Sequence, residues 1–500
     1  MRRIARLTVE ELELDPLLRT YAGRGSRPHS PELLLKLVLY EHSQGRPQPV
    51  QWLKDLEENI VVQWLVFGFR PSRTTLYEFR DRVAPLLEGL NQQVVRTAIA
   101  EGHTEGSRGA LDGTTVAANA TRHRMINLAT VEKRLEILDR EIGQLERGDE
   151  VTPPSEVPEP EGSATPDTTS PDATKANPAQ KQSWKAKTFR GKTRPRDQYR
   201  RARTVLRAKH EVNRRRRKDK RKKEAGIRVA PGDPMAPFGL DKMNTYRPLY
   251  NVQTMSDVET DLVLAYATTR TTADNGQLLP MIERTMKVTG RPLEDLLVDS
   301  GYPSGEDLAE CKKRGVTVYA PWNENSFTEE KRAEKKDRAQ IPKDQFTFDA
   351  STRSYRCPEG KSLTYRERSR QQKASGAYFT IEIYQADPSD CAGCPLKARC
   401  IRGRSGARTV RRGEHEEHVE ELRERMKPLE AKERYVKRGC TIERRFADLK
   451  THRGLQRFSG QTPERADAQV GLAVLAHNLQ TLEKLRIKKE QQPDPGKTAA

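Results

Sequence analysis

Three acidic residues, Asp112, Asp299 and Glu443, stand where acids could hold divalent metal ions. Asp112 lies in a strand-like run, residues 109–119, and Asp299 ends the apolar run LLVD directly before a Ser-Gly-Tyr turn. Glu443 lies in the helical pattern TIERRFADLK, and Lys450, seven positions later, returns to the same helical face. Hard oxygen ligands on two strands and one helix suit two Mg²⁺ or Mn²⁺ ions that catalyse phosphodiester cleavage and joining. Each acid taken alone is more typical of a solvated surface carboxylate or a helix cap, because the chain has seventy-one acids, and only the combination with the strand order favours a metal site.

Other acids compete for these positions, because miscounting one strand would promote Asp257, Asp261 or Asp274. Asp299 is preferred because it follows a buried apolar strand. Asp274 precedes a glycine and helix-forming residues, a pattern that predicts a helix cap instead.

Four of the six cysteines fall in one segment, as Cys391-x2-Cys394-x5-Cys400 with Cys357 thirty-four residues earlier. Four thiolates are the number that a structural Zn²⁺ site requires, and the alternative is four reduced cysteines in a small module. Six cysteines in 500 residues do not make a disulfide framework, so we expect a reducing, cytoplasmic location.

The net charge of +20 and the isoelectric point near 9.6 favour a polyanionic partner. Residues 183–223 contain twenty Lys or Arg against three acids, so this segment alone carries +17. Its aromatic residues Trp184, Phe189 and Tyr199 favour a nucleic-acid-binding arm over the alternative, a solubilising basic tail. Residues 151–178, rich in Pro, Thr, Ser and acids, predict a disordered linker.

No window approaches the roughly 18 consecutive apolar residues that a membrane-spanning helix needs. The N-terminal sequence acquires acids within ten positions and lacks the apolar stretch of a signal peptide. We therefore expect no membrane partner.

The elements that must position these residues can be predicted in two blocks. Helices are expected after Ser30-Pro31, over residues 50–58, and from Pro71-Ser72 toward Ala100. They fit a helix-turn-helix DNA reader and an ordinary helical bundle equally well. An α/β pattern starts near residue 233, with strands at 246–253 and 261–268 expected to pair as a hairpin. A helix at 275–288, a strand at 293–299, a helix at 304–314 and a strand at 316–320 follow.

These motifs together resemble the DDE-superfamily transposases of bacterial insertion sequences. The similarity covers the N-terminal block from Arg27 to Arg80, LDGTTVAANA around Asp112, YNVQ with DSGYPSGEDL, and the block from Tyr435 to Leu482. The resemblance implies a ribonuclease H-like domain of order β1-β2-β3-α-β4-α-β5-α. It also implies that Asp112, Asp299 and Glu443 are the catalytic, metal-binding triad.

The family signature Tyr-x2-Arg-x3-Glu-x6-Lys aligns with Tyr435, Arg438, Glu443 and Lys450. Here four residues, not three, separate Arg438 from Glu443, so the roles of Tyr435 and Arg438 follow less directly than that of Lys450. The resemblance also places the cysteine pattern in an insertion before the catalytic Glu, which favours a structural role for the thiols.

The expected fold is therefore α/β: a ribonuclease H-like mixed-sheet catalytic domain with insertions, plus an all-α, helix-turn-helix-like N-terminal domain. Residues 1–105 form the helical DNA-binding domain, and residues 106–125, 230–322 and 425–487 form the catalytic domain. Residues 126–229 contain a helix, the linker and the basic arm; 323–424 hold the Cys-rich insertion; 488–500 form a flexible tail.

The expected function is that of an insertion-sequence transposase, which binds terminal inverted repeats and target DNA. Mg²⁺- or Mn²⁺-dependent cleavage would free a 3′-hydroxyl, which then attacks the target in the same site. Two element ends must be held together, so a homodimer or larger assembly is expected. The alternatives are a transposase-derived DNA-binding regulator without catalysis and a metal-dependent nuclease without strand transfer.

Overall fold

The computed structural model describes residues 11–21, 29–151, 188–241, 243–321, 341–372, 378–401 and 406–491. The predicted linker from residue 152 onward, Trp184 and the tail beyond residue 491 lie outside these ranges. The chain divides into two compact units, Met1–Leu293 with Arg438–Ala500, and Glu294–Lys437. Each unit is described by itself.

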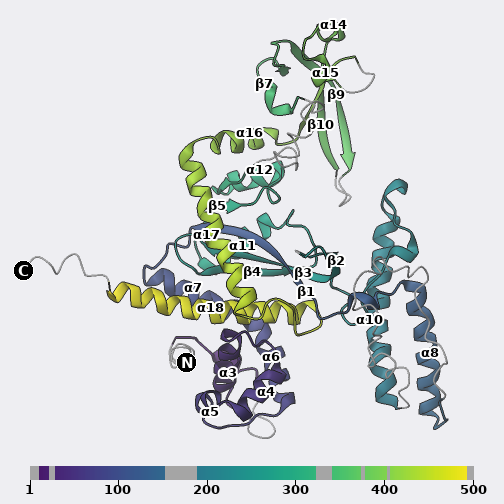
Figure 1. Cartoon of the computed structure of the whole chain (residues 1–500), viewed down its shortest axis with the longest axis vertical. Helices are drawn as coiled ribbons and strands as arrows, with labels where there is room; N and C mark the ends of the chain where they lie inside the picture. Colours follow the sequence, from purple (N-terminus) through teal and green to yellow (C-terminus); the bar gives the residue numbers. More distant parts are fainter. Residues whose placement is uncertain are drawn as a thin grey trace, which may run out of the picture. The chain divides into compact units, whose positions relative to one another are not determined.

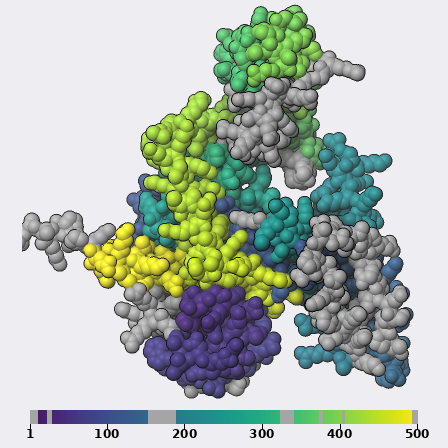
Figure 2. Space-filling view, viewed as in Figure 1, coloured from purple at the N-terminus to yellow at the C-terminus, as the bar shows by residue number. Residues whose placement is uncertain are grey.

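The first unit begins with short helices that form a compact body, purple in Figure 2. They are α2 (Asp15–Leu18), α3 (Pro31–Ser43), α4 (Pro49–Glu58), α5 (Ile60–Leu65), α6 (Arg73–Val83) and α7 (Leu87–Ala100). Ser30 caps α3 by accepting a hydrogen bond from the Leu33 N–H, as the Ser-Pro start predicts. The helix predicted to continue to Ala100 is instead broken by the 3₁₀ turn Ala84–Leu86, where Pro85 has no N–H to donate.

The last helix, α18 (Pro463–Gln491), shares one hydrophobic core with these N-terminal helices. Its buried side chains Leu472, Leu475 and Leu479 belong to the same cluster as residues of α3, α6 and α7. Near-continuous burial over fifteen positions explains why the sequence here is apolar on all sides.

The sheet of the first unit is antiparallel. It contains β1 (Arg108–Ala117), β2 (Phe238–Leu240), β3 (Tyr246–Asp257) and β4 (Val263–Thr269). β3 pairs with β1, β2 and β4, and Asp112 lies opposite Thr254 in the β1–β3 register. The predicted β3–β4 hairpin is confirmed, and helix α11 (Leu278–Thr289) follows it.

Between β1 and β2 the chain forms a helical hairpin of α8 (Leu128–Glu146) and α10 (Phe189–Arg214), side by side in Figure 1. Apolar side chains of both helices make a small separate core, and the ammonium of Lys192 pairs with Glu141 at 2.9 Å in the buried interior. At its base, Ile126 and Val229 exchange two backbone hydrogen bonds. In its described part, the basic segment is therefore a folded helix from Phe189 to Arg214, followed by the short 3₁₀ turn Lys218–Lys220.

In the second unit, β5 (Asp295–Val298) pairs in parallel with β6 (Thr317–Tyr319) across helix α12 (Gly305–Lys313). A separate antiparallel sheet has the order β11-β10-β9-β8-β7. Its strands are Thr347–Asp349 (β7), Ser354–Arg356 (β8), Ser362–Gln372 (β9), Tyr378–Ala386 (β10) and Thr409–Gly413 (β11). The short helices α14 (Pro388–Ala392) and α15 (Lys397–Cys400) follow β10. Helix α16 (Glu416–Arg425) follows, and helix α17 (Leu429–Thr451) begins in this unit and belongs to the first unit from Arg438 onward.

Apart from the short strand β2 and the helical hairpin, the chain order is β1, β3 and β4 as antiparallel strands, then α11, β5, α12 and β6, with β5 and β6 parallel. Helix α17 comes later in the chain. This mixed α/β succession is that of a ribonuclease H-like domain, joined to a helical N-terminal region, as the sequence predicts. No helix in the described ranges combines the length and apolar character needed to cross a membrane.

Candidate active site

Asp112 lies on β1 with its side chain 24% exposed. One carboxylate oxygen, Oδ1, accepts a hydrogen bond from the Gly113 N–H at 2.8 Å. The other, Oδ2, pairs with the guanidinium of Arg438 on α17 at 3.0 Å. Arg438 therefore reaches the first acid of the predicted triad despite the one-residue difference in signature spacing.

A second contact joins α17 to β1, because the Lys450 ammonium donates to the Thr115 carbonyl oxygen at 3.2 Å. Arg438 and Lys450 are twelve residues apart, about 18 Å along a helix. Glu443 is exposed, lies between them and shares a helical face with Lys450. The first unit thus brings the Glu443 segment of α17 alongside the strand that carries Asp112.

A buried polar network holds α17 against α18. Asp448 accepts hydrogen bonds from His477 at 3.1 Å and from Arg453 at 2.8 Å, and the buried Arg445 pairs with Asp261 at 3.2 Å. Burial alone would raise the pKa of Asp448, but these hydrogen bonds and charges outweigh it and hold the pKa well below its usual range. Burial lowers the pKa of His477 to about 4.

The neighbouring Asn478 is fully buried. Its amide oxygen accepts from the Val263 N–H, and its amide nitrogen donates to Asn91 and to the Val263 carbonyl. These bonds join α18 to β4 and α7.

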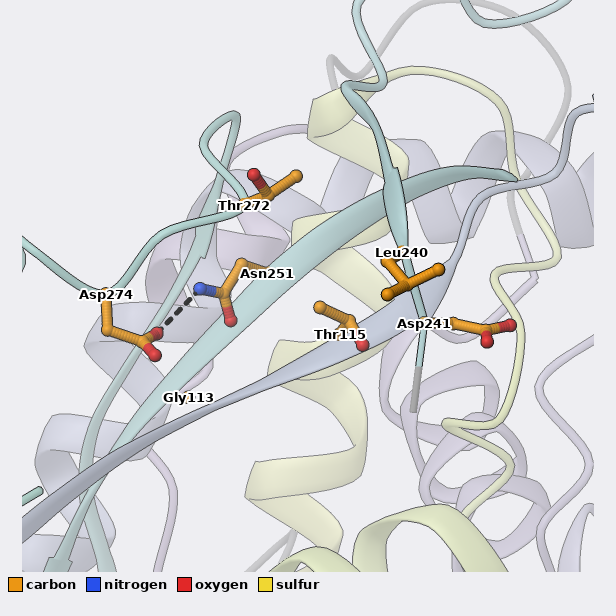
Figure 3. Close-up of a pocket in the computed structure, with 7 residues that line it drawn as sticks. All are labelled: Gly113, Thr115, Leu240, Asp241, Asn251, Thr272 and Asp274. Atoms are coloured by element: carbon orange, nitrogen blue, oxygen red, sulfur yellow. Dashed lines mark hydrogen bonds between the residues drawn. The ribbon is translucent and has the colours of Figure 1, made fainter. Parts of the chain in front are cut away.

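The opposite face of β1 carries a second polar group, centred on Asp274. Its Oδ1 accepts a hydrogen bond from the side-chain amide of Asn251 at 2.8 Å (Figure 3). It accepts a second from the side-chain amide of Gln253, also at 2.8 Å. The prediction that Asp274 caps a helix is wrong, because α11 has Gln277 at its N-cap and no side-chain cap bond. A Cβ atom added to Gly113 would lie 2.3 Å from both Asp274 Oδ1 and Gln253 Nε2, so a larger residue here would force these two side chains to shift.

These side chains surround an open hollow of about 220 Å³ (Figure 3). It is lined by Gly113, Thr115, Leu240, Asp241, Asn251, Thr272 and Asp274. Alternate residues of a strand face opposite sides of the sheet, so the side chain of Asp112 points away from this hollow. This group was not predicted from the sequence, although YNVQ, with polar Asn251 and Gln253 in a buried strand, contained the indication.

Asp299 belongs to the second unit and directly follows β5, at the strand end where the sequence predicts it. Its side chain is exposed, and Oδ1 accepts from the Ser300 N–H at 2.8 Å. The Tyr302 N–H donates to the Asp299 carbonyl and closes the turn, and a capping box of Ser304 and Asp307 then starts α12.

The four predicted zinc ligands line one small hollow of about 30 Å³ in the second unit. Cys357 Sγ accepts a hydrogen bond from the Lys361 N–H at 3.3 Å, within a tight turn whose Gly360 has φ +76°. Cys391 and Cys394 lie on and after α14, and Cys400 ends α15. No three of the four sulfur atoms lie within 4.8 Å of one another. In the described ranges, the group of three ligand atoms that meets this distance comes from His415, Glu417 and His418.

Two family models match the chain. Residues 1–82 match a transposase domain family, DUF772, and residues 356–483 match the transposase DDE domain family. The second match spans α17, with Arg438, Glu443 and Lys450, and all four cysteines. Searches of curated proteins and of solved structures gave no match.

Proposed function

We propose that the chain is a DDE-superfamily insertion-sequence transposase that binds element ends and catalyses metal-dependent DNA cleavage and strand transfer. The matches to two transposase domain families support this proposal. The observation that carries the proposal is the attachment of α17 to β1 through Arg438–Asp112 and Lys450–Thr115. This attachment sets the Glu443 segment beside Asp112, two acids separated by more than 300 residues in the sequence. Asp299, exposed at the end of β5, is the third acid of the proposal.

The donor set fits hard divalent ions, because all three side chains offer carboxylate oxygens. Mg²⁺ or Mn²⁺ held by Asp112, Asp299 and Glu443 would supply activation of the attacking oxygen and neutralisation of charge on the phosphate. Arg438 balances the charge of Asp112 in the protein itself. When the carboxylate is engaged elsewhere, the guanidinium is available to a DNA phosphate, for which its paired N–H donors are suited. The ammonium of Lys450 adds a second positive charge on the face of α17 that carries Glu443.

The helical hairpin supplies the surface proposed to bind the DNA backbone. On and after α10, residues 214–218 are an unbroken run of five exposed Arg or Lys, followed by Lys220, Arg221, Lys222 and Lys223. Two acids offset only part of this charge, since Glu211 pairs with Arg214 and Arg215, and Asp219 pairs with Arg217. A folded, cationic protrusion of this kind suits phosphate contacts that are independent of base sequence.

We also propose that Cys357, Cys391, Cys394 and Cys400 hold a structural Zn²⁺. The N–H to sulfur bond at Cys357 and the shared hollow support it, since thiolate ligands need such orienting bonds. Reduced thiols of this kind suit the cytoplasm. Synapsis of two element ends would further require a homodimer or larger assembly.

The test is incubation of the full chain with labelled duplexes that carry the inverted repeats flanking its coding region, with Mg²⁺ or Mn²⁺. Wild type should nick the repeats and join the free 3′ ends to target DNA. Asp112→Asn, Asp299→Asn and Glu443→Gln should each bind DNA but reduce cleavage at least about 10³-fold, about 4 kcal/mol of activation free energy. Glu433→Gln, an exposed acid on the same helix, should cleave normally.

Three other outcomes would replace this proposal. Binding without nicking by wild type would mean a DNA-binding regulator, and nicking without joining would mean a nuclease. If Asp274→Asn abolished cleavage while Asp299→Asn left it intact, the second metal-binding acid would be Asp274.

A further inference from the structure

The start of α16 in the second unit carries three metal-ligating side chains that include none of the acids or cysteines considered so far. His415 directly precedes the helix, and Glu417 and His418 lie in its first turn. One ligand atom from each lies within 4.8 Å of the others. His418 Nε2 is 3.8 Å from Glu417 Oε1, and the two imidazole rings are stacked with centroids 6.1 Å apart.

These separations are close to those of a bound ion. Zn²⁺ bonds of about 2.0 to 2.2 Å to nitrogen and oxygen place tetrahedral ligand atoms about 3.3 Å from one another. A small rotation of each side chain therefore closes the site without backbone movement. The backbone already directs both rings to the same end of the helix, because the His418 N–H donates to the His415 carbonyl at 3.1 Å.

A carboxylate behind His418 provides an independent indication of a ligand site. Glu421 Oε2 is 3.5 Å from His418 Nδ1, and Glu421 is itself held by the Lys312 ammonium of α12 at 2.7 and 2.9 Å. Histidine ligands in proteins commonly have their second ring nitrogen oriented by such a carboxylate. This arrangement leaves Nε2 of His418 directed to Glu417.

We propose that His415, Glu417 and His418 bind a divalent transition-metal ion of the zinc class. The competing explanation is that Glu417 stabilises the helix N-terminus and His418 forms ordinary ion pairs. That explanation gives His415 no role, whereas a two-histidine, one-carboxylate set uses all three and leaves a position for water or a further ligand.

The ion would stabilise a specific junction. A Cβ atom built on Gly305, the first residue of α12, would lie 3.2 Å from His415 Cβ, so the two helix starts touch. Gly305 is six residues after Asp299. Metal binding would therefore hold the start of α16 in one conformation where it packs against α12, beside the turn that carries Asp299, whether or not the chain transposes DNA.

The test is the zinc content of the full chain, measured by native mass spectrometry. Wild type should bind a zinc ion that is lost in His418→Gln and in Glu417→Gln, with the cysteine site unchanged. The matched controls Glu424→Gln on the same helix and His452→Gln, both exposed, should keep it. Equal zinc content in His418→Gln and wild type would overturn the proposal.

A second measurement does not depend on the folding of any variant. Wild-type protein is first loaded with one equivalent of Zn²⁺ and then titrated with Co²⁺. Binding at the histidines should give visible cobalt bands without the intense thiolate charge-transfer band. No cobalt binding, or a thiolate band alone, would overturn the proposal.

Discussion

At the scale of single residues, Arg438 and the proposed metal ion would compete for the carboxylate of Asp112. A half-buried carboxylate with a guanidinium partner cannot take a divalent ion without giving up or sharing that partner. Arg438 therefore opposes metal binding at Asp112 while it neutralises the site.

Arg438→Gln should bind Mn²⁺ about three- to tenfold more tightly in the absence of DNA, because the competing cation is gone. Its cleavage activity should nevertheless fall if the guanidinium holds the phosphate. Titration calorimetry and the cleavage assay measure the two effects separately. Unchanged Mn²⁺ affinity would mean that Arg438 does not compete with the ion for Asp112. The control is Arg434→Gln, which removes a different ion pair of the same helix.

Gly113→Ala should destabilise the first unit by about 1 to 3 kcal/mol, the usual range for overpacking. The added methyl group would overlap the bonded amide of Gln253 and carboxylate of Asp274, so these must separate. Gly89→Ala in α7 is the control, since nothing lies within 4 Å of its Cβ position. It should increase stability by up to about 1 kcal/mol, because alanine favours a helix over glycine. Urea unfolding that shows equal effects for both variants would contradict the overlap.

At the scale of elements, α17 is oriented by β1 on one face and by the α18 network on another. Asp448→Asn weakens the second attachment because Arg453 and His477 lose their shared anionic partner. We expect a loss of about 1 to 3 kcal/mol of stability, since Asp448 is 26% exposed, and faster amide exchange along α17. Glu433→Gln, on the exposed face of α17, should change neither stability nor amide exchange. Unchanged amide exchange in Asp448→Asn would mean that the network does not hold α17 in place.

The basic residues of the α8–α10 hairpin should make DNA binding depend on salt concentration. Replacing Arg214, Arg216 and Arg217 with Gln should weaken binding to any duplex similarly. It should reduce the slope of log Kobs against log salt by about 0.9 for each DNA phosphate that the variant no longer neutralises. Lys484→Gln, an exposed cation on α18, is the control. Weaker binding confined to one DNA sequence would mean base recognition instead.

At the scale of the whole molecule, three buried titratable groups should shape stability against pH. Burial lowers the pKa values of His42 and His477 to about 4, so their contribution is complete above pH 6.5 and is lost as pH falls toward 4. Burial, with Asp55 nearby, raises the pKa of Glu41 to about 9, so its contribution is complete below pH 4.5 and is lost as pH rises toward 9.

From these groups, the free energy of unfolding should be highest near pH 6.5 and decline on both sides. Urea unfolding from pH 5 to 9 measures it, and Glu41→Gln should flatten the alkaline decline. An alkaline decline of equal size in Glu41→Gln would exclude Glu41 as its cause.

Much of the fold follows from local patterns. The Ser30-Pro31 helix start, the β3–β4 hairpin and the strand that ends at Asp299 are all encoded by neighbouring residues. The sequence does not predict the break at Pro85, because the apolar periodicity continues through it. It does not predict α5 either, because six residues are too few to show a helical periodicity. Arg438–Asp112 and Asp274–Asn251 join residues distant in sequence, so no local pattern could reveal them.

The two backbone bonds between Ile126 and Val229 mean that the chain leaves the sheet region and returns to it at one point. Residues that exchange both hydrogen bonds have Cα atoms about 5.5 Å apart, a distance that a two-residue turn can span. Everything from residue 127 to 228 could therefore be replaced by a short connection without moving β1 or β2. The helical hairpin of α8 and α10 is therefore a closed insertion, and a change in its charge or length would leave the strand that bears Asp112 in place.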